Sequence, residues 1–342
     1  MAKKFIFLEY FIVEEGEMWD SVVDILARKV RQGVDVRVLY DGTCSLVRLP
    51  YSYPKKLRQL GIRCKVFAPI RPFISTTYNN RDHRKILVID GRVGFTGGVN
   101  LADEYINRRE KFGHWKDAAV MLRGDAVRSL TLMFLRQWNA GEKERIYEPY
   151  LTGADPQPGA GGYIIPYGDS PLDDERTGKM VYLDIINTAR DYVYIMTPYL
   201  ILDNEMISAL TFAARRGVDV RMILPGIPDK RYAAILAKSH YKQLVNAGVK
   251  VYEYTPGFVH SKVFVSDDTK AVVGTINLDY RSLYLHFECA AYLYKTPVTG
   301  DVLRDFEETF PKCRLITPQA VQEQKLSTRL LGSILKLAAP LM

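Results

Sequence analysis

The stretch RDHRKILVIDGRVGFTGGVN, residues 81–100, places charged residues ahead of a short apolar run and a glycine-rich segment. The apolar residues 86–89 are rich in β-branched side chains and precede Asp-Gly, which predicts a buried strand followed by a turn. Side chains alternate along a strand, so His83 and Lys85 should point to the same side. A single His-x-Lys pair is usually only the polar end of a strand, and alone it carries little functional weight.

The pattern occurs a second time in the same chain. Residues 260–277, HSKVFVSDDTKAVVGTIN, match the first stretch when the two are aligned on their histidines, and both read H-x-K-x-x-x-x-D. A glycine and an asparagine follow 14 and 17 residues after each histidine. Five positions are therefore held in register twice, namely His83 and His260, Lys85 and Lys262, Asp90 and Asp267, Gly97 and Gly274, and Asn100 and Asn277.

The duplication extends beyond this motif. The segments that begin at Phe5 and at Val193 both read as strand, loop, amphipathic helix, Gly-Val-Asp-Val-Arg and strand. A repeat unit of this length indicates a duplicated domain, and alternating strands and helices make each half α/β. The expected organisation is a first domain, a linker rich in glycine and proline, a second domain and a C-terminal amphipathic helix, at residues 1–151, 152–162, 163–325 and 326–342.

Composition limits the partners of the protein. The 342 residues carry a formal net charge of +8, which favours an anionic partner, either nucleic acid or an anionic lipid surface. The four cysteines lack any CxxC spacing and are expected to be reduced, mostly buried thiols. The printed sequence contains no run of 18 or more apolar residues, so it predicts no membrane-spanning helix.

Two histidines in matching motifs are the groups that double displacement requires. One neutral imidazole attacks, and the other protonates the leaving group. The paired lysines and asparagines supply donors for the oxygens of a tetrahedral anion, which suits a phosphodiester. A zinc site is disfavoured because each histidine has a cation two residues away, and no G-x-S-x-G sequence supports a serine hydrolase.

These motifs resemble the phospholipase D superfamily, whose signature is the duplicated H-x-K-x-x-x-x-D pattern. Within it, the sequence most resembles bacterial cardiolipin synthases, and the likeness is carried by HRKILVIDGRVGFTGGVNLADEY, TPYLILDNEM and NLDYRSLYLHFE. The resemblance implies two phospholipase D-like α/β domains, each a mixed β-sheet flanked by helices, related by a pseudo-twofold axis with one active site between them. It also implies a phosphatidyl-histidine intermediate, with no metal requirement and no cofactor.

The resemblance also assigns roles to the motif residues. His83 would be the nucleophile, and His260 would be the general acid and then the base. Phosphate oxygens would be bound by the paired lysines and asparagines, Lys85, Lys262, Asn100 and Asn277. The aspartates Asp90 and Asp267 belong to the family's catalytic signature, but they stand at the far end of each strand and are interpreted as turn or supporting residues.

Two later carboxylates are better placed to orient the histidines. Asp117 and Glu288 occupy comparable places in the two halves, and each opens an apolar strand. Each is expected to reach the Nδ1 atom of the histidine in its own half and to fix the tautomer, the alternative being an ordinary charge at a strand edge. Structural positions are favoured for the remaining histidines, His114, His240 and His286.

The resemblance implies a phosphatidyltransferase that joins two phosphatidylglycerols into cardiolipin and releases glycerol. Its partners would be anionic phospholipid and a bacterial membrane surface, approached from the cytoplasmic face by a peripheral protein. The alternative is a phosphodiesterase of the same superfamily that hydrolyses phospholipid or nucleic acid, and nucleic acid is the less favoured of these substrates.

The two ends of the chain raise separate expectations. The second half has a helix before its first strand, whereas the first half begins at the strand itself. We therefore expect an N-terminally truncated catalytic part, the alternative being a shortened domain with an uncovered hydrophobic sheet face. Residues 326–342 have apolar side chains at helical spacing. They form either a closing helix packed on the second domain or an interfacial helix on anionic lipid.

Overall fold

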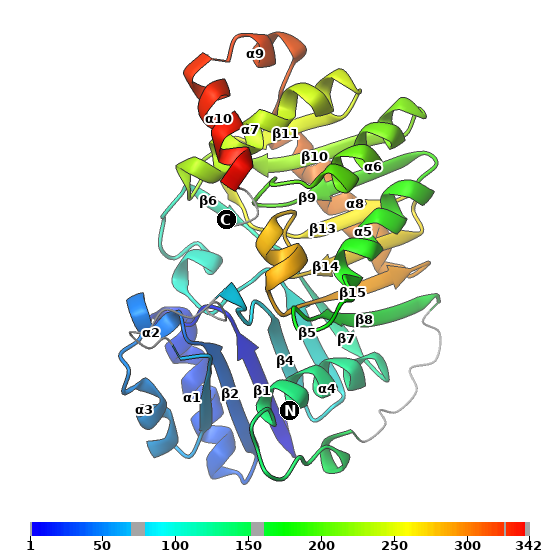
Figure 1. The fold of residues 1–342 in the computed structure, drawn as a ribbon. Helices are drawn as coiled ribbons and strands as arrows, with labels where there is room; N and C mark the ends of the chain where they lie inside the picture. The colour runs from blue at the N-terminus through cyan, green and yellow to red at the C-terminus, as the bar shows by residue number, and fades with distance from the viewer. Residues whose placement is uncertain (1, 70–78, 152–160, 325, 339–342) are drawn as a thin grey trace.

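Two β-sheets lie next to each other in the computed structural model, which describes residues 2–69, 79–151, 161–324 and 326–338 (Figure 1). The first sheet has the strand order β3-β2-β1-β4-β5-β7. Its strands are β1 (Phe5–Tyr10), β2 (Asp35–Asp41), β3 (Arg63–Phe67), β4 (Lys85–Ile89), β5 (Val93–Gly97) and β7 (Ala119–Arg123). The linker predicted at residues 152–162 lies mostly outside the described residues.

The second sheet repeats this order and adds one strand at each edge. Its order is β16-β11-β10-β9-β13-β14-β15-β8, in which β9, β10 and β11 correspond to β1, β2 and β3. In both sheets these first strands are parallel. The next strand, which is β4 or β13, runs antiparallel to them. The motif lysine is the first residue of β4 and directly precedes β13. The predicted mixed sheet in each half is confirmed. The strands are β8 (Tyr163–Asp169), β9 (Tyr192–Met196), β10 (Asp219–Pro225), β11 (Lys250–Tyr254), β13 (Val263–Ser266), β14 (Lys270–Gly274), β15 (Glu288–Tyr294) and β16 (Cys313–Leu315).

Amphipathic helices cover the outer face of each sheet (Figure 1). In α1, the buried residues Trp19, Val23 and Leu26 recur at three- and four-residue spacing, so one stripe of the helix faces the sheet. The first sheet is covered by α1 (Glu17–Arg31) and α3 (Tyr53–Gln59), and the second by α5 (Thr177–Thr188), α6 (Asn204–Arg215) and α7 (Arg231–Asn246). Shorter segments are α2 (Cys44–Val47), η2 (Asp103–Ile106), η3 (Glu148–Tyr150), η4 (Arg281–Leu285), η5 (Phe310–Lys312) and α9 (Pro318–Gln322).

A shared apolar core joins the inner faces of the two sheets. Val88 of β4 and Val265 of β13 belong to the same buried cluster, together with Phe134 of α4 (Ala126–Trp138) and Phe306 of α8 (Val298–Thr309). Burial of this apolar surface holds the two halves against each other. The short parallel pair of β6 (His114–Lys116) and β12 (Gly257–Val259) adds backbone hydrogen bonds between the halves.

The outer faces of the two sheets are covered unequally. In the second half, Tyr182 of α5 stacks on Phe264 of β13, with ring centroids 4.0 Å apart. Leu87 of β4 is the counterpart of Phe264, and no helix in the described part of the chain takes the place of α5 beside it. Leu87 and Phe95 are partly exposed, and Met121 is 49% exposed. The first half therefore presents an apolar sheet face that the second half buries.

The helix α10 (Leu326–Ala338) packs on α7 with one of its sides. Gly332 lies against Ser239, and Leu335 joins Leu236 in a small apolar cluster. The other side is exposed and carries Leu330, Leu331, Ile334 and Leu337. Thus α10 closes the second domain and still presents an apolar face. None of the helices in the described part of the chain is both long and apolar enough to cross a membrane.

Candidate active site

The two motif histidines lie in one cavity between the halves. His83 and His260 both line this cavity, whose volume is about 590 Å³. The His83 N–H donates to the Phe287 carbonyl at 2.9 Å, and the His260 N–H donates to the Lys116 carbonyl at 2.7 Å. Each backbone segment that carries a motif histidine is therefore paired with the opposite half, and this pairing brings the two imidazoles to a common site.

Each histidine is bound by a carboxylate from the opposite half. The Nδ1 atom of His83 lies 2.9 Å from both carboxylate oxygens of Glu288, and the Nδ1 atom of His260 lies 2.7 Å from Oδ2 of Asp117. The prediction that each carboxylate reaches the histidine of its own half is wrong. The reason is the backbone pairing, because each carboxylate directly follows the residue whose carbonyl accepts from the opposite histidine.

The two carboxylates are supported differently. In the second half, the Thr275 hydroxyl donates to the Glu288 carboxylate. Gly98 stands at the matching position of the first half, and a Cβ atom added there would lie 2.0 Å from Oδ1 of Asp117. That oxygen also accepts from the N–H of Ala118 at 2.8 Å. A glycine is required at position 98 because the Asp117 carboxylate occupies the space of a side chain.

Burial and charge keep both imidazoles neutral and both carboxylates ionised. Burial lowers the pKa of His83 well below its ordinary value, and the attraction of Glu288 only partly opposes this. Burial and the nearby Lys262 ammonium lower the pKa of His260 to about 4. Burial alone would raise the pKa values of Glu288 and Asp117, but contact with the histidines outweighs it and lowers both. Each Nδ1–H then donates to its carboxylate, which leaves Nε2 as the basic ring nitrogen.

The two motif lysines are buried behind the histidines. The Nζ atom of Lys85 donates to the backbone carbonyl of His83. The Nζ atom of Lys262 contacts the carbonyl of His260 and also lies 2.9 and 3.0 Å from Nδ1 and Nε2 of its ring. Burial lowers the pKa of Lys85 to about 8 and that of Lys262 to about 7. Lys85 thus contacts only the backbone of its histidine, whereas Lys262 also contacts the imidazole ring.

The two predicted asparagines line the cavity but differ in their contacts. Oδ1 of Asn100 accepts from the N–H of Ile12 at 2.9 Å, and its Nδ2 donates to the Tyr105 hydroxyl at 2.8 Å. Oδ1 of Asn277 is buried and has no hydrogen-bond partner among the described residues. Asn100 is therefore engaged in holding the cavity wall, whereas the amide of Asn277 is the less committed of the two.

The motif aspartates lie outside the cavity and support turns. Asp90 has a φ of 53° and Asp267 has a φ of 49°, so both adopt the left-handed conformation that aspartate tolerates. The Asp90 carboxylate accepts from the N–H groups of residues 3–5 at 2.7 to 2.9 Å, and Asp267 accepts from those of residues 190–192 at 2.9 to 3.0 Å. Each fastens the start of the neighbouring antiparallel strand, β1 or β9, to the end of the motif strand. In this structure both aspartates therefore make structural contacts away from the cavity, although they stand in the catalytic signature.

Aromatic rings hold the imidazoles in place, and the sequence analysis did not predict them. Phe11 lies edge-on to His83 with ring centroids 4.9 Å apart, and Tyr105 lies edge-on to His260 at 5.4 Å. Phe11 and Tyr199 both line the cavity, but Tyr199 matches Ile12, because the residues that follow these two, Val13 and Leu200, bridge to the matching leucines Leu101 and Leu278. An alignment of the repeats therefore locates the cavity-lining segment of each half but does not pair the two rings.

His286 also lines the cavity, contrary to the structural position favoured from the sequence. Its ring centroid lies 5.5 Å from that of His83, and its Nδ1 lies 3.7 Å from Oε1 of Glu288. Neither of its ring nitrogens has a hydrogen-bond partner among the described residues. His240 is buried in α7 and His114 bonds a tyrosine hydroxyl away from the cavity, so these two are structural.

The same neighbourhood contains a group of potential metal ligands. Among the described residues, His83, His286 and Glu288 hold three such atoms within 4.8 Å of one another. However, the Glu288 carboxylate already accepts hydrogen bonds from His83 and from the Thr275 hydroxyl. A metal ion would replace these bonds, so the donor set fits an oriented imidazole better than a metal centre.

Charge around the cavity favours an anionic substrate. Among the described residues, five cationic side chains and three acidic ones line it, namely Arg48, Arg81, Lys111, Lys230 and Arg281, and Glu104, Asp229 and Asp279. Glu104 is engaged by Arg48 at 3.0 Å. Burial raises the pKa of Asp279 above its ordinary value. The lining is therefore suited to a phosphate group.

Comparisons with known proteins agree with this geometry. The family model described as "Cardiolipin synthase, PLD-like domain" matches residues 1–123 and 182–310. An uncharacterized protein of Streptococcus mutans is 60% identical over 341 residues, which cover all of this chain and 74% of that protein. A cardiolipin synthase of Halalkalibacterium halodurans is 40% identical over 344 residues, which cover all of this chain and 68% of that enzyme.

The fold is also found among solved structures. The crystal structure of a phosphatidylserine synthase of Haemophilus influenzae superposes with a TM-score of 0.73 at 14% identity, covering 99% of this chain and 88% of that one. At this identity the likeness concerns the fold alone. The family model and the match to cardiolipin synthases over the whole of this chain show that it belongs to the cardiolipin synthase family of phospholipase D-like proteins and is a phosphatidyltransferase of that superfamily.

Proposed function

We propose that the protein transfers the phosphatidyl group of one phosphatidylglycerol to the headgroup hydroxyl of a second, which forms cardiolipin and releases glycerol. The observation that carries the proposal is the pair of imidazoles in one cavity, each bound at Nδ1 by a carboxylate of the opposite half. The relatives named cardiolipin synthase supply the substrate class.

In the first step, Nε2 of His83 attacks the phosphorus of the first phosphatidylglycerol. The bond between phosphorus and the glycerol headgroup oxygen breaks, and the Lys262 ammonium supplies a proton that Nε2 of His260 passes to that oxygen, so glycerol leaves as a neutral alcohol. The product is a phosphatidyl group bound to Nε2 of His83. Because Nδ1–H of this ring donates to Glu288, the carboxylate stabilises the positive charge that the imidazole acquires.

The lysine contacts support this division of roles. Lys262 lies 3.0 Å from Nε2 of His260, so it competes for the electron pair that a nucleophile would need. Lys85 bonds only the backbone carbonyl of His83 among the contacts described, and the ring is left available. The pKa of Lys262, lowered by burial to about 7, also lets it share a proton with His260 at neutral pH. His83 is therefore the better nucleophile and His260 the better proton carrier.

In the second step, His260 acts as the base. It removes the proton from the headgroup hydroxyl of a second phosphatidylglycerol, and that oxygen attacks the phosphorus bound to His83. The bond between phosphorus and nitrogen breaks, His83 returns to the neutral form, and cardiolipin is released. Asn277 and the cations that line the cavity bind the phosphate oxygens throughout, and Asn100 holds the wall. Lys85 and Lys262, which are buried behind the histidines, add positive charge beside the phosphate.

Water competes with the second lipid for the intermediate. Water is present at about 55 M, so the acceptor must gain its advantage from position and from exclusion of solvent. A membrane surface supplies phosphatidylglycerol at high local density, and the exposed apolar side of α10 offers a contact with it. We infer a peripheral protein that acts on the cytoplasmic face of a bacterial membrane.

The test uses vesicles that contain phosphatidylglycerol labelled in the phosphatidyl moiety. The purified chain should produce labelled cardiolipin and an equal amount of glycerol. Denaturation during turnover should leave label on the protein, and His83→Ala should abolish this label. Single-stranded DNA, supplied in parallel, should not be cleaved.

Each contrary result has a defined meaning. Phosphatidic acid without cardiolipin would identify a hydrolase, and cleavage of DNA would identify a nuclease. Label retained by the His83→Ala protein but lost from His260→Ala would exchange the two histidine roles. Either of the first two outcomes refutes the proposed transfer.

A further inference from the structure

Exposed apolar side chains surround the mouth of the catalytic cavity. We call them the apolar collar, and they are Leu46, Val47, Ile106, Ile227 and Tyr232. Val47 is 84% exposed and Leu46 is 55% exposed, although both stand in the short helix α2. Large apolar side chains at such exposure are common singly, but a contiguous group around a functional opening marks an interaction surface.

The collar is fixed to the cavity by its neighbours in the chain. Thr43 and Arg48, which flank α2, both line the cavity. In η2, Tyr105 lines the cavity and is followed directly by the collar residue Ile106. Tyr232 lines the cavity itself. The collar thus continues outward from the cavity wall in both halves of the protein.

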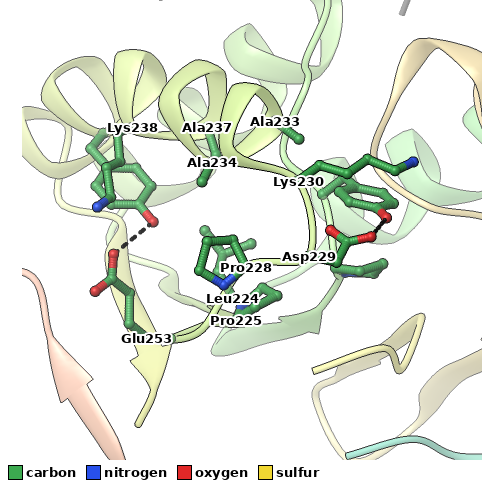
Figure 2. Close-up of a pocket in the computed structure, with 14 residues that line it drawn as sticks. Leu224, Pro225, Pro228, Asp229, Lys230, Ala233, Ala234, Ala237, Lys238 and Glu253 are labelled. Carbon is green, nitrogen blue, oxygen red and sulfur yellow. Dashed lines mark hydrogen bonds between the residues drawn. The ribbon is translucent and has the colours of Figure 1, made fainter. Parts of the chain in front are cut away.

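The loop between β10 and α7 completes the collar. Figure 2 shows Asp229 and Lys230 where this loop enters α7, beside a small cleft of about 40 Å³. The Tyr199 hydroxyl donates to the Asp229 carboxylate at 2.6 Å and fastens the loop to the cavity wall. Ile227 on the same loop lies next to Gly113, because a Cβ atom added to that glycine would be 3.1 Å from Cδ1 of the isoleucine. The loop therefore bridges the two halves at the cavity mouth.

Basic side chains stand among the collar residues. Lys111 and Lys230 are exposed, and both also line the cavity. Apolar side chains surrounded by cations match the boundary between the acyl chains and the anionic headgroups of a bilayer. A protein partner would instead be expected to bury a broader surface with a largely uncharged centre.

We propose that the apolar collar inserts into an anionic bilayer and seats the cavity mouth directly on the membrane, with α2 as the contact of the first half. This inference rests on the proposed function, because the collar surrounds the site to which a lipid must come. The packed side of α10 reaches the neighbourhood of the cavity, since Leu335 joins Ile201 and Tyr280, and Tyr280 lies between the cavity-lining residues Asp279 and Arg281. Both halves then contact the lipid at once, and a headgroup enters the cavity without leaving the bilayer surface.

The experiment compares two double variants of the full chain. Leu46→Ser/Val47→Ser removes the most exposed part of the collar and replaces no residue that lines the cavity. Ile25→Ser/Phe212→Ser is the matched control, because both side chains are exposed in the helices α1 and α6, away from the mouth. Binding is measured by flotation with vesicles of phosphatidylcholine and phosphatidylglycerol, and activity is measured on the soluble diester bis(p-nitrophenyl) phosphate.

The collar variant should bind mixed vesicles at least about ten-fold more weakly than the unmodified protein, since two apolar side chains no longer enter the lipid. Its turnover of the soluble diester should stay within about two-fold, because the site itself is unchanged. The control variant should match the unmodified protein in both measurements. Vesicles without phosphatidylglycerol should bind all three proteins less, because the cations lose their partners.

A gain-of-function variant covers the case in which the serine variant fails to fold. Val47→Trp should strengthen vesicle binding, and its tryptophan emission should shift to shorter wavelength when vesicles are added. Unchanged vesicle binding by both α2 variants would overturn the inference. A dimer in lipid-free solution that Leu46→Ser/Val47→Ser dissociates would instead assign the collar to contact between two copies.

The inference and the proposed function fail in different ways. Vesicle binding that depends on the collar, without cardiolipin formation, would leave the docking surface intact and remove the proposed reaction. If the collar variant instead formed cardiolipin at the full rate and bound vesicles as the unmodified protein does, the proposed reaction would stand and the docking surface would be refuted.

Discussion

Replacing Glu288 with glutamine tests the exchange of carboxylates between the halves. Both Glu288 oxygens lie 2.9 Å from Nδ1 of His83, and the Thr275 hydroxyl donates to the same carboxylate. Glutamine keeps the size of the side chain but removes its charge, and its NH₂ group can donate to Nδ1. The ring proton would then move to Nε2, and that tautomer has no electron pair with which to attack phosphorus.

The expected loss is large because the variant loses both the carboxylate charge beside His83 and the reactive tautomer of its imidazole. In serine hydrolases, the analogous change from aspartate to asparagine behind a catalytic histidine lowers turnover by about 10⁴-fold. We expect Glu288→Gln to slow formation of the phosphatidyl-histidine by about 10³- to 10⁴-fold, which corresponds to about 4 to 5.5 kcal/mol in the activation barrier. Asp117→Asn should have a similar effect on turnover of phosphatidylglycerol, because it deprives His260 of the same support.

The leaving group separates the two variants. Phosphatidyl-p-nitrophenol releases nitrophenolate without a proton, so a defect in the general acid no longer slows the first step. The initial burst of nitrophenolate should be restored in Asp117→Asn and should stay slow in Glu288→Gln. Asp267→Asn, outside the cavity, controls for general effects of a carboxylate-to-amide change.

The reverse pattern would refute the reasoning. If the nitrophenyl substrate restored Glu288→Gln and left Asp117→Asn slow, then either Glu288 supports the general acid or the two histidines have the opposite roles. Measuring label on His83 and on His260 in the same samples would tell these two explanations apart.

Four further outcomes follow from other contacts. Gly98→Ser should lower turnover of phosphatidylglycerol by at least about 100-fold without loss of fold, because its Cβ atom displaces the Asp117 carboxylate from His260; stopped-flow glycerol release measures this. Asp90→Ala should lower the free energy of unfolding by about 2 kcal/mol in urea titrations while kcat is retained, because three backbone N–H groups lose their acceptor. Burial lowers the pKa of His240 to about 3, so the unfolded state takes up its proton first as the pH falls below about 6.5. At pH 4 the protein should therefore be less stable than at pH 7, and thermal melts of His240→Leu should recover about 3 kcal/mol of that loss. Deleting residues 326–342 should lower cardiolipin formation more than turnover of a soluble diester and should raise the share of phosphatidic acid; an equal loss on both substrates would make α10 purely structural.

Much of the fold could be predicted because the same sequence pattern occurs in both halves of the chain. The strand order of the first half recurs in the second, as expected from segments that share their alternation and their turns. The shared cavity followed from the same duplication, because two matched His-x-Lys stretches suggest one site built from both. These features depend on local patterns, which an alignment of the chain with itself reveals.

The partner of each carboxylate could not be predicted in this way. Asp117 and Glu288 were identified from their matching places, but their partners depend on how the halves meet. That contact is set by the parallel pair of β6 and β12 and by the backbone bond between His83 and Phe287. Neither is encoded in the periodicity of one half, so the natural assumption of pairing within a half was wrong.

The position of His286 was missed for a related reason. It has no counterpart in the first half at the same distance from the motif, so comparison of the repeats gives no signal for it. The segment η4 turns the chain after Asn277 and returns it beside His83, which brings the ring of His286 into the cavity. Such a return depends on packing of η4 in three dimensions rather than on a pattern in the sequence.

The exchanged carboxylates also explain why the two halves act as one enzyme. Each imidazole lacks its orienting carboxylate unless the opposite half is docked, so neither half alone contains a complete histidine–carboxylate pair. Because each pair combines residues of both halves, the surroundings of one histidine can differ from those of the other while both pairs stay intact. The divergence is visible in the pairs themselves, where a shorter carboxylate lies against Gly98 in one and a longer carboxylate accepts from Thr275 in the other. A duplicated domain with identical surroundings would offer two equivalent nucleophiles, whereas this arrangement supports the proposed separation of attack from proton transfer.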